Sequence, residues 1–395
     1  MSDLSAGRFS PGKDRVAVVW LGVAIGVLTI VAIYEQVFGS HSTDITDIYD
    51  HLLVIKDMSP HGPWNLYSLF FLLVYALSFG SKDYIVLALT GTAVITASVI
   101  AKGILSYFVL RRVTPNKILA ALLSLALIVV MSLPNWWKPE QLYLDKIVPT
   151  IWFNSTAMLT MPFAIWLFFA AIKWFKKDTI SNFVWVCLSS LLSVLTKPNY
   201  ILAFLPVLGL VTLVQAAFRR NRSGFRNLLL LIGLSALVGG ILYIQSTEPV
   251  SSGPFGNPNA SEESVHIAFA PFGVWRLYSP NIPVSLLLSV AFPLGVILLY
   301  YQEVKTDVSV LLAWGVFLVA TAQYALLAET GERFADANWI WASNIAMYLL
   351  FLVSTVVLLA QPRSKRFYFL GSLLALHVAA GIYYYARVAL GMGYY

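Results

Sequence analysis

The chain has 395 residues, of which 59% are hydrophobic and only 11% are charged, and its mean hydropathy is +0.77. This composition excludes an ordinary soluble domain and is typical of a polytopic membrane protein. The formal net charge of +7 does not indicate a nucleic-acid partner, because most Lys and Arg residues lie in short connectors between apolar segments. The single cysteine, Cys187, excludes an intrachain disulfide.

Apolar stretches of membrane-spanning length recur along the whole chain. We predict an all-α fold of about eleven transmembrane helices in one integral membrane domain, 1–395. The first stretch is too long for a signal-peptide core and no small-residue cleavage pattern follows it, so we interpret it as a retained anchor. The predicted spans are 16–38, 84–110, 117–134, 156–175, 181–196, 200–218, 226–245, 282–301, 307–328, 339–360 and 366–388.

The short apolar segment 64–79 decides the predicted topology. If it crossed the membrane, the basic clusters at Arg111, Lys173, Arg219 and Arg363 would lie outside while the N-terminus stayed inside. The positive-inside rule disfavours that arrangement. We therefore predict that 64–79 is a juxtamembrane helix of a multi-pass plasma (inner) membrane protein, with the N-terminus cytoplasmic and the C-terminus outside.

In this topology three substantial loops lie outside: 39–83, 134–155 and 246–281, the last opening with a Pro/Gly/Ser-rich stretch that we expect to be mobile. Most acidic residues also fall on the outer face. The inner connectors are short and basic, and no GxxxxGK[ST] phosphate-binding loop occurs. We therefore expect polar chemistry outside and no nucleotide site inside.

The first outer loop crowds acids and histidines into HSTDITDIYDHLLVIKD, residues 41–57. The spacing of its apolar residues predicts a helix over 45–58, with Asp44, Asp47 and His51 on one polar stripe and Asp50 beside it. A carboxylate at the membrane boundary can act as a general base. Two carboxylates with a histidine can instead hold a divalent cation, Mg²⁺ or Mn²⁺, against a phosphate. The plain alternative is an interfacial amphipathic helix whose acids are solvated.

Three cations on the outer side, Lys197, Arg276 and Arg333, are candidates for binding a phosphate. Each can equally be a snorkelling side chain, and Arg333 can belong to an ion-pair cluster with Glu329 and Glu332. The second outer loop is rich in aromatic residues that suit either interface anchoring or sugar stacking. Its acids, Glu140 and Asp145, are the ones that could join the first-loop cluster.

Part of this pattern resembles the GT-C superfamily of membrane glycosyltransferases. A retained first span is followed by an acid and an aromatic residue (Asp44…Tyr49), a Pro-preceded aromatic helix (PWNLYSLFF, 63–71) and a span ending in Arg111-Arg112. The resemblance covers about residues 15–175. It leaves the later TKPNY and ETGERFADANW segments without assigned chemistry, and the chain has no large C-terminal soluble domain.

The resemblance implies a transferase that moves a sugar from a polyprenyl-phosphate carrier to a glycan, lipid or protein acceptor at the outer face. It implies Asp44 as the first-loop base or metal ligand, with Asp47 as the alternative, and Asp145 as a weaker match to a second-loop acid. His51, Tyr49 and the three cations would then contact substrate. The alternative function is a lipid-linked-glycan flippase or another transporter, for which Lys102 is the mid-span charge. A third is a structural assembly subunit.

Overall fold

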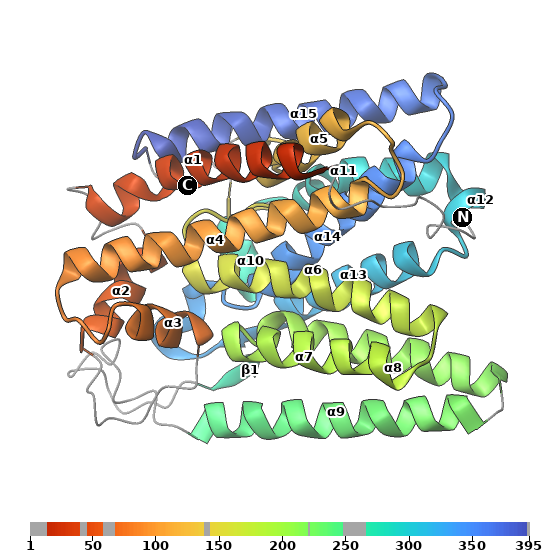
Figure 1. The fold of residues 1–395 in the computed structure, drawn as a ribbon, viewed down its shortest axis with the longest axis horizontal. Coiled ribbons are helices and arrows are strands. Elements are labelled where there is room, and N and C mark those ends of the chain that lie inside the picture. The colour runs from red at the N-terminus through yellow and green to blue at the C-terminus, as the bar shows by residue number, and fades with distance from the viewer. Residues whose placement is uncertain are drawn as a thin grey trace.

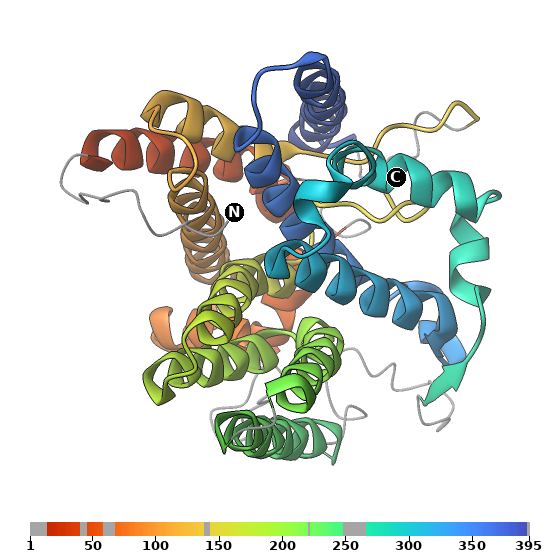
Figure 2. The same cartoon turned by 90° about the vertical axis from the view of Figure 1, so that its right-hand side faces the viewer.

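The computed structural model describes residues 14–39, 46–57, 68–137, 143–219, 222–247 and 266–392. It is an all-α bundle with one two-stranded antiparallel ribbon (Figures 1 and 2). Within these ranges, nine helices are long and apolar enough to cross a membrane, as expected of a multi-pass membrane protein. They are α1 (Arg15–Phe38), α4 (Tyr84–Leu110), α6 (Ser155–Lys176), α8 (Asn199–Arg219), α9 (Arg222–Thr247), α11 (Ile282–Leu299), α13 (Val308–Leu326), α14 (Ile340–Leu359) and α15 (Lys365–Ala389).

Helices α6 and α14 form the centre of the bundle, because they are buried along most of their length. Both are apolar on all sides, which is typical of a helix surrounded by other helices. The outer helices α1, α9 and α15 bury one face and expose apolar side chains such as Trp20 and Tyr243 on the other. Exposed apolar faces on long helices suit contact with lipid chains.

Two predicted spans are shorter than the others. Helix α7 (Ile180–Thr196) has 17 residues, and α5 (Lys117–Val129) has 13, ending five residues before the predicted end at 134. After α5 the chain continues as buried, non-helical backbone. The Met131 N–H donates to the carbonyl of His377 (3.1 Å), and the Leu133 N–H donates to that of Leu288 (3.1 Å). Bonds to α15 and α11 thus replace the intrahelical bonds that α5 gives up.

The described part of the loop 39–83 contains two short helices at one end of the bundle (Figure 1), α2 (Asp47–Asp57) and α3 (Leu69–Leu77). The predicted helix over 45–58 is confirmed in α2, which buries Ile48, Leu52 and Ile55 on one face. The two ends of the predicted helix, residues 45 and 58, lie outside the described residues. With nine residues, α3 is about 14 Å long and too short to cross a membrane.

The same end of the bundle carries a small ribbon and two short helical elements. Strand β1 (Ile267–Phe269) pairs with β2 (Leu327–Glu329), and β2 leads from the end of α13 into a 3-10 turn, η4 (Gly331–Asp336). This pairing joins the loop 246–281 to the segment before α14. The remaining helices are α10 (Gly273–Tyr278) and α12 (Tyr301–Val304).

The described part of the loop 134–155 is not a surface loop. Its residues 143–154 are nearly all buried between helices, including Tyr143 and Trp152. Trp136, by contrast, is 75% exposed. The aromatic residues of this loop therefore divide between the interior of the bundle and its surface.

We predict that Gly381→Ala in α15 destabilises the fold. An added Cβ would overlap the backbone carbonyl of Val129, where the chain leaves α5 and passes against α15. Overpacking of this kind costs about 1–3 kcal/mol, and a backbone atom relaxes less readily than a side chain. The matched control is Gly371→Ala on the same helix, where an added Cβ meets nothing within 4 Å. Thermal unfolding in detergent should show a lower midpoint for Gly381→Ala only; equal midpoints would contradict the prediction.

Candidate functional site

The candidate site forms where α2 meets the beginning of α6. The side-chain amide of Asn154 donates a hydrogen bond to the carboxylate of Asp47, the first residue of α2. Asn154 is buried and Asp47 is half-buried, so the carboxylate lies at the edge of the bundle with one side against protein. Of the two acids singled out in this loop, Asp47 is therefore placed, whereas Asp44 lies outside the described residues.

Lys197 brings a positive charge to the same amide. The residue follows the last turn of α7, and its Nζ lies 3.5 Å from Asn154 Oδ1 and 3.2 Å from Thr156 Oγ1. Its ammonium also lies 4.8 Å from the centroid of the Trp341 ring, a cation–π contact. Asn154 therefore stands between anion and cation, with its N–H₂ group toward Asp47 and its oxygen toward Lys197.

His51 lies one turn after Asp47 on α2. It contacts Ser155, the residue that follows Asn154 and begins α6. Its Nδ1 is 2.6 Å from Ser155 Oγ, and its ring packs edge-on against Phe71 of α3. Burial, together with the positive charge of Lys197, lowers the pKa of His51 to about 3. The imidazole is consequently neutral at physiological pH and holds α2 to α6 without adding charge to the site.

The start of α6 forms here because Asn154 is a good N-cap residue. Its Oδ1 accepts the backbone N–H of Ala157 (2.8 Å) and the hydroxyl of Thr156 (2.8 Å). The same side chain thus ends the irregular segment 143–154, starts a 22-residue helix and contacts Asp47. The positive end of the α6 dipole also favours a carboxylate at this position.

The Lys197 turn is fixed by contacts from two other segments. The hydroxyl of Ser68, which caps α3, donates to the carbonyl of Thr196 (3.0 Å). The amide of Asn199 donates to the carbonyl of Asn338, between η4 and α14 (2.9 Å). The TKPNY and ETGERFADANW segments, to which the family resemblance assigned no chemistry, therefore pack against each other at the site.

Arg333 lies nearby but is paired with carboxylates. Its Nε is 3.4 Å from Glu329 Oε2 and 3.3 Å from Asp336 Oδ2. Asn338 donates to the same Glu329 oxygen (2.9 Å). The predicted ion pair between Arg333 and Glu329 is thus present. The side chain of Glu332, the other predicted partner, lies outside the described residues. Arg333 remains 45% exposed and within electrostatic range of Asp47.

Burial dominates the electrostatics of the two central groups. Desolvation raises the pKa of Asp47, although the charge of Lys197, the Asn154 hydrogen bond and the charge of Arg333 oppose the rise. Desolvation lowers the pKa of Lys197 to about 8, although the charges of Asp47 and Glu329 act against it. The site therefore combines a carboxylate with increased proton affinity and an amine that is still mostly protonated at neutral pH.

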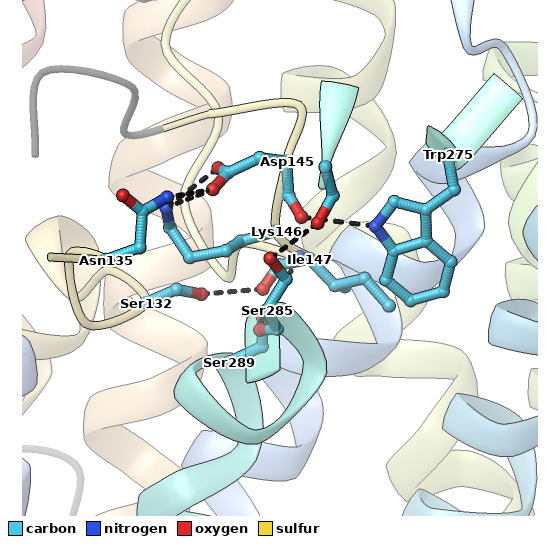
Figure 3. Close-up of polar contacts among 9 residues, drawn as sticks. Ser132, Asn135, Asp145, Lys146, Ile147, Trp275, Ser285 and Ser289 are labelled. Carbon is cyan, nitrogen blue, oxygen red and sulfur yellow. Dashed lines mark hydrogen bonds and ion pairs between the residues drawn. The ribbon is translucent and has the colours of Figure 1, made fainter. Parts of the chain in front are cut away.

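Three residues singled out in the sequence lie away from this cluster. Tyr49 packs on Tyr84, with ring centroids 5.4 Å apart. Arg276 is exposed at the end of α10, where its guanidinium lies over Phe272. Asp145 is fully buried in an ion pair with Lys146, between Nζ and Oδ1 at 2.7 Å (Figure 3). Neither Arg276 nor Asp145 makes a described contact with Asp47 or Lys197.

Within the described ranges, no three His, Cys, Asp or Glu side chains form a group that could hold a metal ion. The groups that surround Asp47 do not suit a divalent cation either, because it faces an amide N–H₂ and lies within electrostatic range of two cations. The second acid of the predicted Mg²⁺ or Mn²⁺ site, Asp44, lies outside the described residues. We derive no step through a metal.

Asn154, Ser155 and Trp341 belong to the site but were not singled out as site residues from the sequence. For Asn154 and Ser155, the sequence signal was the Asn-Ser-Thr triplet at the start of a predicted span. An Asn or Ser in that place is typical of a helix N-cap. Trp341 had no comparable signal, since it lies within a predicted span rich in apolar residues.

Comparison of the chain with protein-family models gives no match, and comparison with curated proteins gives none either. The site is therefore interpreted from its own geometry and chemistry.

We predict that Lys197 loses its proton near pH 8. The rate of its acylation by an amine-selective reagent, followed by peptide mass spectrometry, should rise with a midpoint near that pH. In Asp47→Asn the midpoint should fall, because the negative charge that stabilises the ammonium is gone. Asp50→Asn, which removes an acid from the same helix, is the matched control and should keep the wild-type midpoint. An unchanged midpoint in Asp47→Asn would contradict the arrangement.

Proposed function

We propose that this protein is a membrane glycosyltransferase that moves a sugar from a polyprenyl-phosphate carrier to an acceptor hydroxyl at the outer face. The observation that carries the proposal is the arrangement of Asp47 and Lys197 on opposite sides of Asn154 at one end of a membrane bundle. Such a site offers a base for the acceptor and a cation for the phosphate. The resemblance of residues 15–175 to the GT-C superfamily also supports it.

Asp47 would act as the general base. Its raised pKa makes the carboxylate a better proton acceptor than a solvated aspartate. As the acceptor oxygen bonds to the anomeric carbon, its proton passes to Asp47 and the bond from that carbon to the phosphate oxygen breaks. The products are the glycosylated acceptor and polyprenyl phosphate.

Lys197 would stabilise the departing phosphate. Its described contacts, Asn154, Thr156 and the Trp341 ring, carry no charge, so its positive charge is not neutralised by a direct ion pair. Partial desolvation strengthens the interaction of such a cation with an anion. Arg333 could join it only by exchanging Glu329 or Asp336 for phosphate oxygens, because both carboxylates now contact its Nε.

A transporter is the second candidate, favoured by Lys102 in the middle of α4. This lysine is 4% exposed, and its Nζ lies 3.9 Å from the centroid of the Tyr348 ring. No carboxylate among the described residues lies within ion-pair distance of it. Buried intramembrane charges often belong to transport pathways. The glycosyltransferase is preferred because its acid, amide and cation are joined by direct contacts.

For topology, we propose eleven spans, with α5 and α7 added to the nine long helices, a cytoplasmic N-terminus and an outer C-terminus. The basic connectors support this orientation. In this topology the Asp47 site faces outward, where a lipid-phosphate sugar is reached without a nucleotide.

We predict that Asp47→Asn lowers transfer by about 10²–10⁴-fold, the usual contribution of a general base. Purified protein in lipid would be supplied with a panel of polyprenyl-phosphate sugars, and release of polyprenyl phosphate would be measured. The matched control, Asp50→Asn, should stay within about threefold of wild type. Asp44→Asn is assayed alongside them.

Full activity in Asp47→Asn would mean that Asp47 is not the general base. Loss of activity in Asp44→Asn alone would assign that role to Asp44. If no donor in the panel supports transfer while labelled lipid-linked glycan crosses the bilayer, the transporter replaces the transferase.

We predict that a cysteine at position 251 is labelled from outside intact cells by a membrane-impermeant maleimide. The background carries Cys187→Ser, which removes the single native thiol. A cysteine at position 306, in the connector after α12, is the opposite control and should react only after permeabilisation. The reverse pattern would overturn the proposed orientation.

A further inference from the structure

A fully buried ion pair lies in the chain that leads to the site but outside the site itself. Lys146 Nζ is 2.7 Å from Asp145 Oδ1 and 2.8 Å from Asp145 Oδ2, and neither side chain is accessible to solvent. Asn135 donates a further hydrogen bond to Asp145 Oδ2 (Figure 3). The proposed reaction uses none of these three groups.

The backbone around the pair is held from several directions. The indole N–H of Trp275 on α10 donates to the Asp145 carbonyl (3.1 Å). The N–H of Ile147 donates to Ser289 Oγ on α11 (3.1 Å), and its carbonyl accepts from Ser132 Oγ (2.7 Å). Figure 3 shows these contacts converging on three consecutive residues.

The local conformation needs such support. Leu144 has φ 52°, in the left-handed region that non-glycine residues rarely occupy. The Asp145 N–H donates to the Tyr143 carbonyl across this residue (2.5 Å), which makes a tight turn. Conformations of this kind persist only where the surroundings fix them. The turn starts the segment that ends at Asn154.

Stability alone is a weak explanation for the pair. Removing two charges from water is unfavourable, and apolar residues of similar volume often serve stability equally well. The best-attested use of buried charges is to select one register among several. The segment 143–154 has no regular ladder of backbone hydrogen bonds to set its register, and the hydrogen bond from Asn135 ties the pair to chain that precedes the segment.

We propose that the Asp145–Lys146 pair, held by Asn135, is a register lock: it fixes how the buried segment 143–154 enters α6 and thereby positions the Asn154 amide between Asp47 and Lys197. Asp145 and Lys146 are then positioning residues. Only the consequence for catalysis rests on the proposed glycosyltransferase function; the geometric claim stands without it.

The test measures Lys197 acylation against pH, a readout that needs no substrate. Asp145→Leu/Lys146→Met removes both charges and leaves no unpaired charge in the interior. If the lock is lost, Asn154 Oδ1 moves from the ammonium and the neutral amine becomes more populated. We expect Lys197 to react about threefold faster at pH 7, a fall of about half a pH unit in midpoint. Asn154→Ala should show the same change.

Lys146→Arg keeps the pair and is the matched control, with an expected wild-type profile. The melting temperature of the double variant should equal or exceed that of wild type. A folded double variant with a wild-type Lys197 profile would overturn the lock. If that variant does not fold, Asn135→Ala, which loosens the pair without removing a charge, takes its place, and an unchanged profile again overturns the proposal. Failure of glycosyl transfer would not affect this result.

Discussion

Irregular backbone inside a membrane bundle is tolerated only where every polar group finds a partner within the protein. The chain between α5 and α6 is subject to this constraint, because it passes through the interior without forming a helix. Its partners are side chains and carbonyls of the surrounding helices. Asn344 on α14 accepts the N–H of Val148 (3.0 Å), and Gln36 on α1 donates to the carbonyl of Trp152 (2.9 Å). Contacts with α1 and α10, α11, α14 and α15 therefore define one path for this chain.

That path determines the candidate site. The segment delivers Asn154 and Ser155 to the end of the bundle where α2 and the Lys197 turn meet. Asp47 and His51 come from α2, whereas Lys197 comes from the turn after α7. The site therefore depends on long-range packing, and its geometry reflects how well the interior segment is held.

Much of the architecture could be predicted from the sequence, because membrane spans are encoded locally in their apolar length. The amphipathic face of α2 was also readable, since Ile48, Leu52 and Ile55 recur with helical spacing. The end of α5 was predicted five residues too late, because residues 130–133 are apolar enough to continue the helix and Pro134 indicates an end only after them. The interruption depends on tertiary bonds to α11 and α15, which leave no mark in the local sequence.

The site was predictable in part for the same reason. Charged residues are rare in this chain, so Asp47 and Lys197 stood out individually. Their connection through Asn154 did not, because it requires knowing that residues far apart in the chain meet. Asp145 shows the opposite case: its conspicuous charge is neutralised by the residue beside it and lies in the interior. Composition identifies rare groups, while packing decides which of them can meet a ligand.

A single side chain, that of Asn154, makes two kinds of contact at the site. Its oxygen caps α6 and its nitrogen holds Asp47, so one side chain serves both the fold and the chemistry. Among the residues that cap helices well, serine and threonine carry donor and acceptor on a single oxygen and so cannot offer them on two separate atoms, and aspartate would set a negative charge against Asp47. Asparagine alone among them combines an acceptor with an amide donor. A substitution at position 154 therefore cannot change how α6 begins without also changing how the Asp47 carboxylate is held. The reverse also applies.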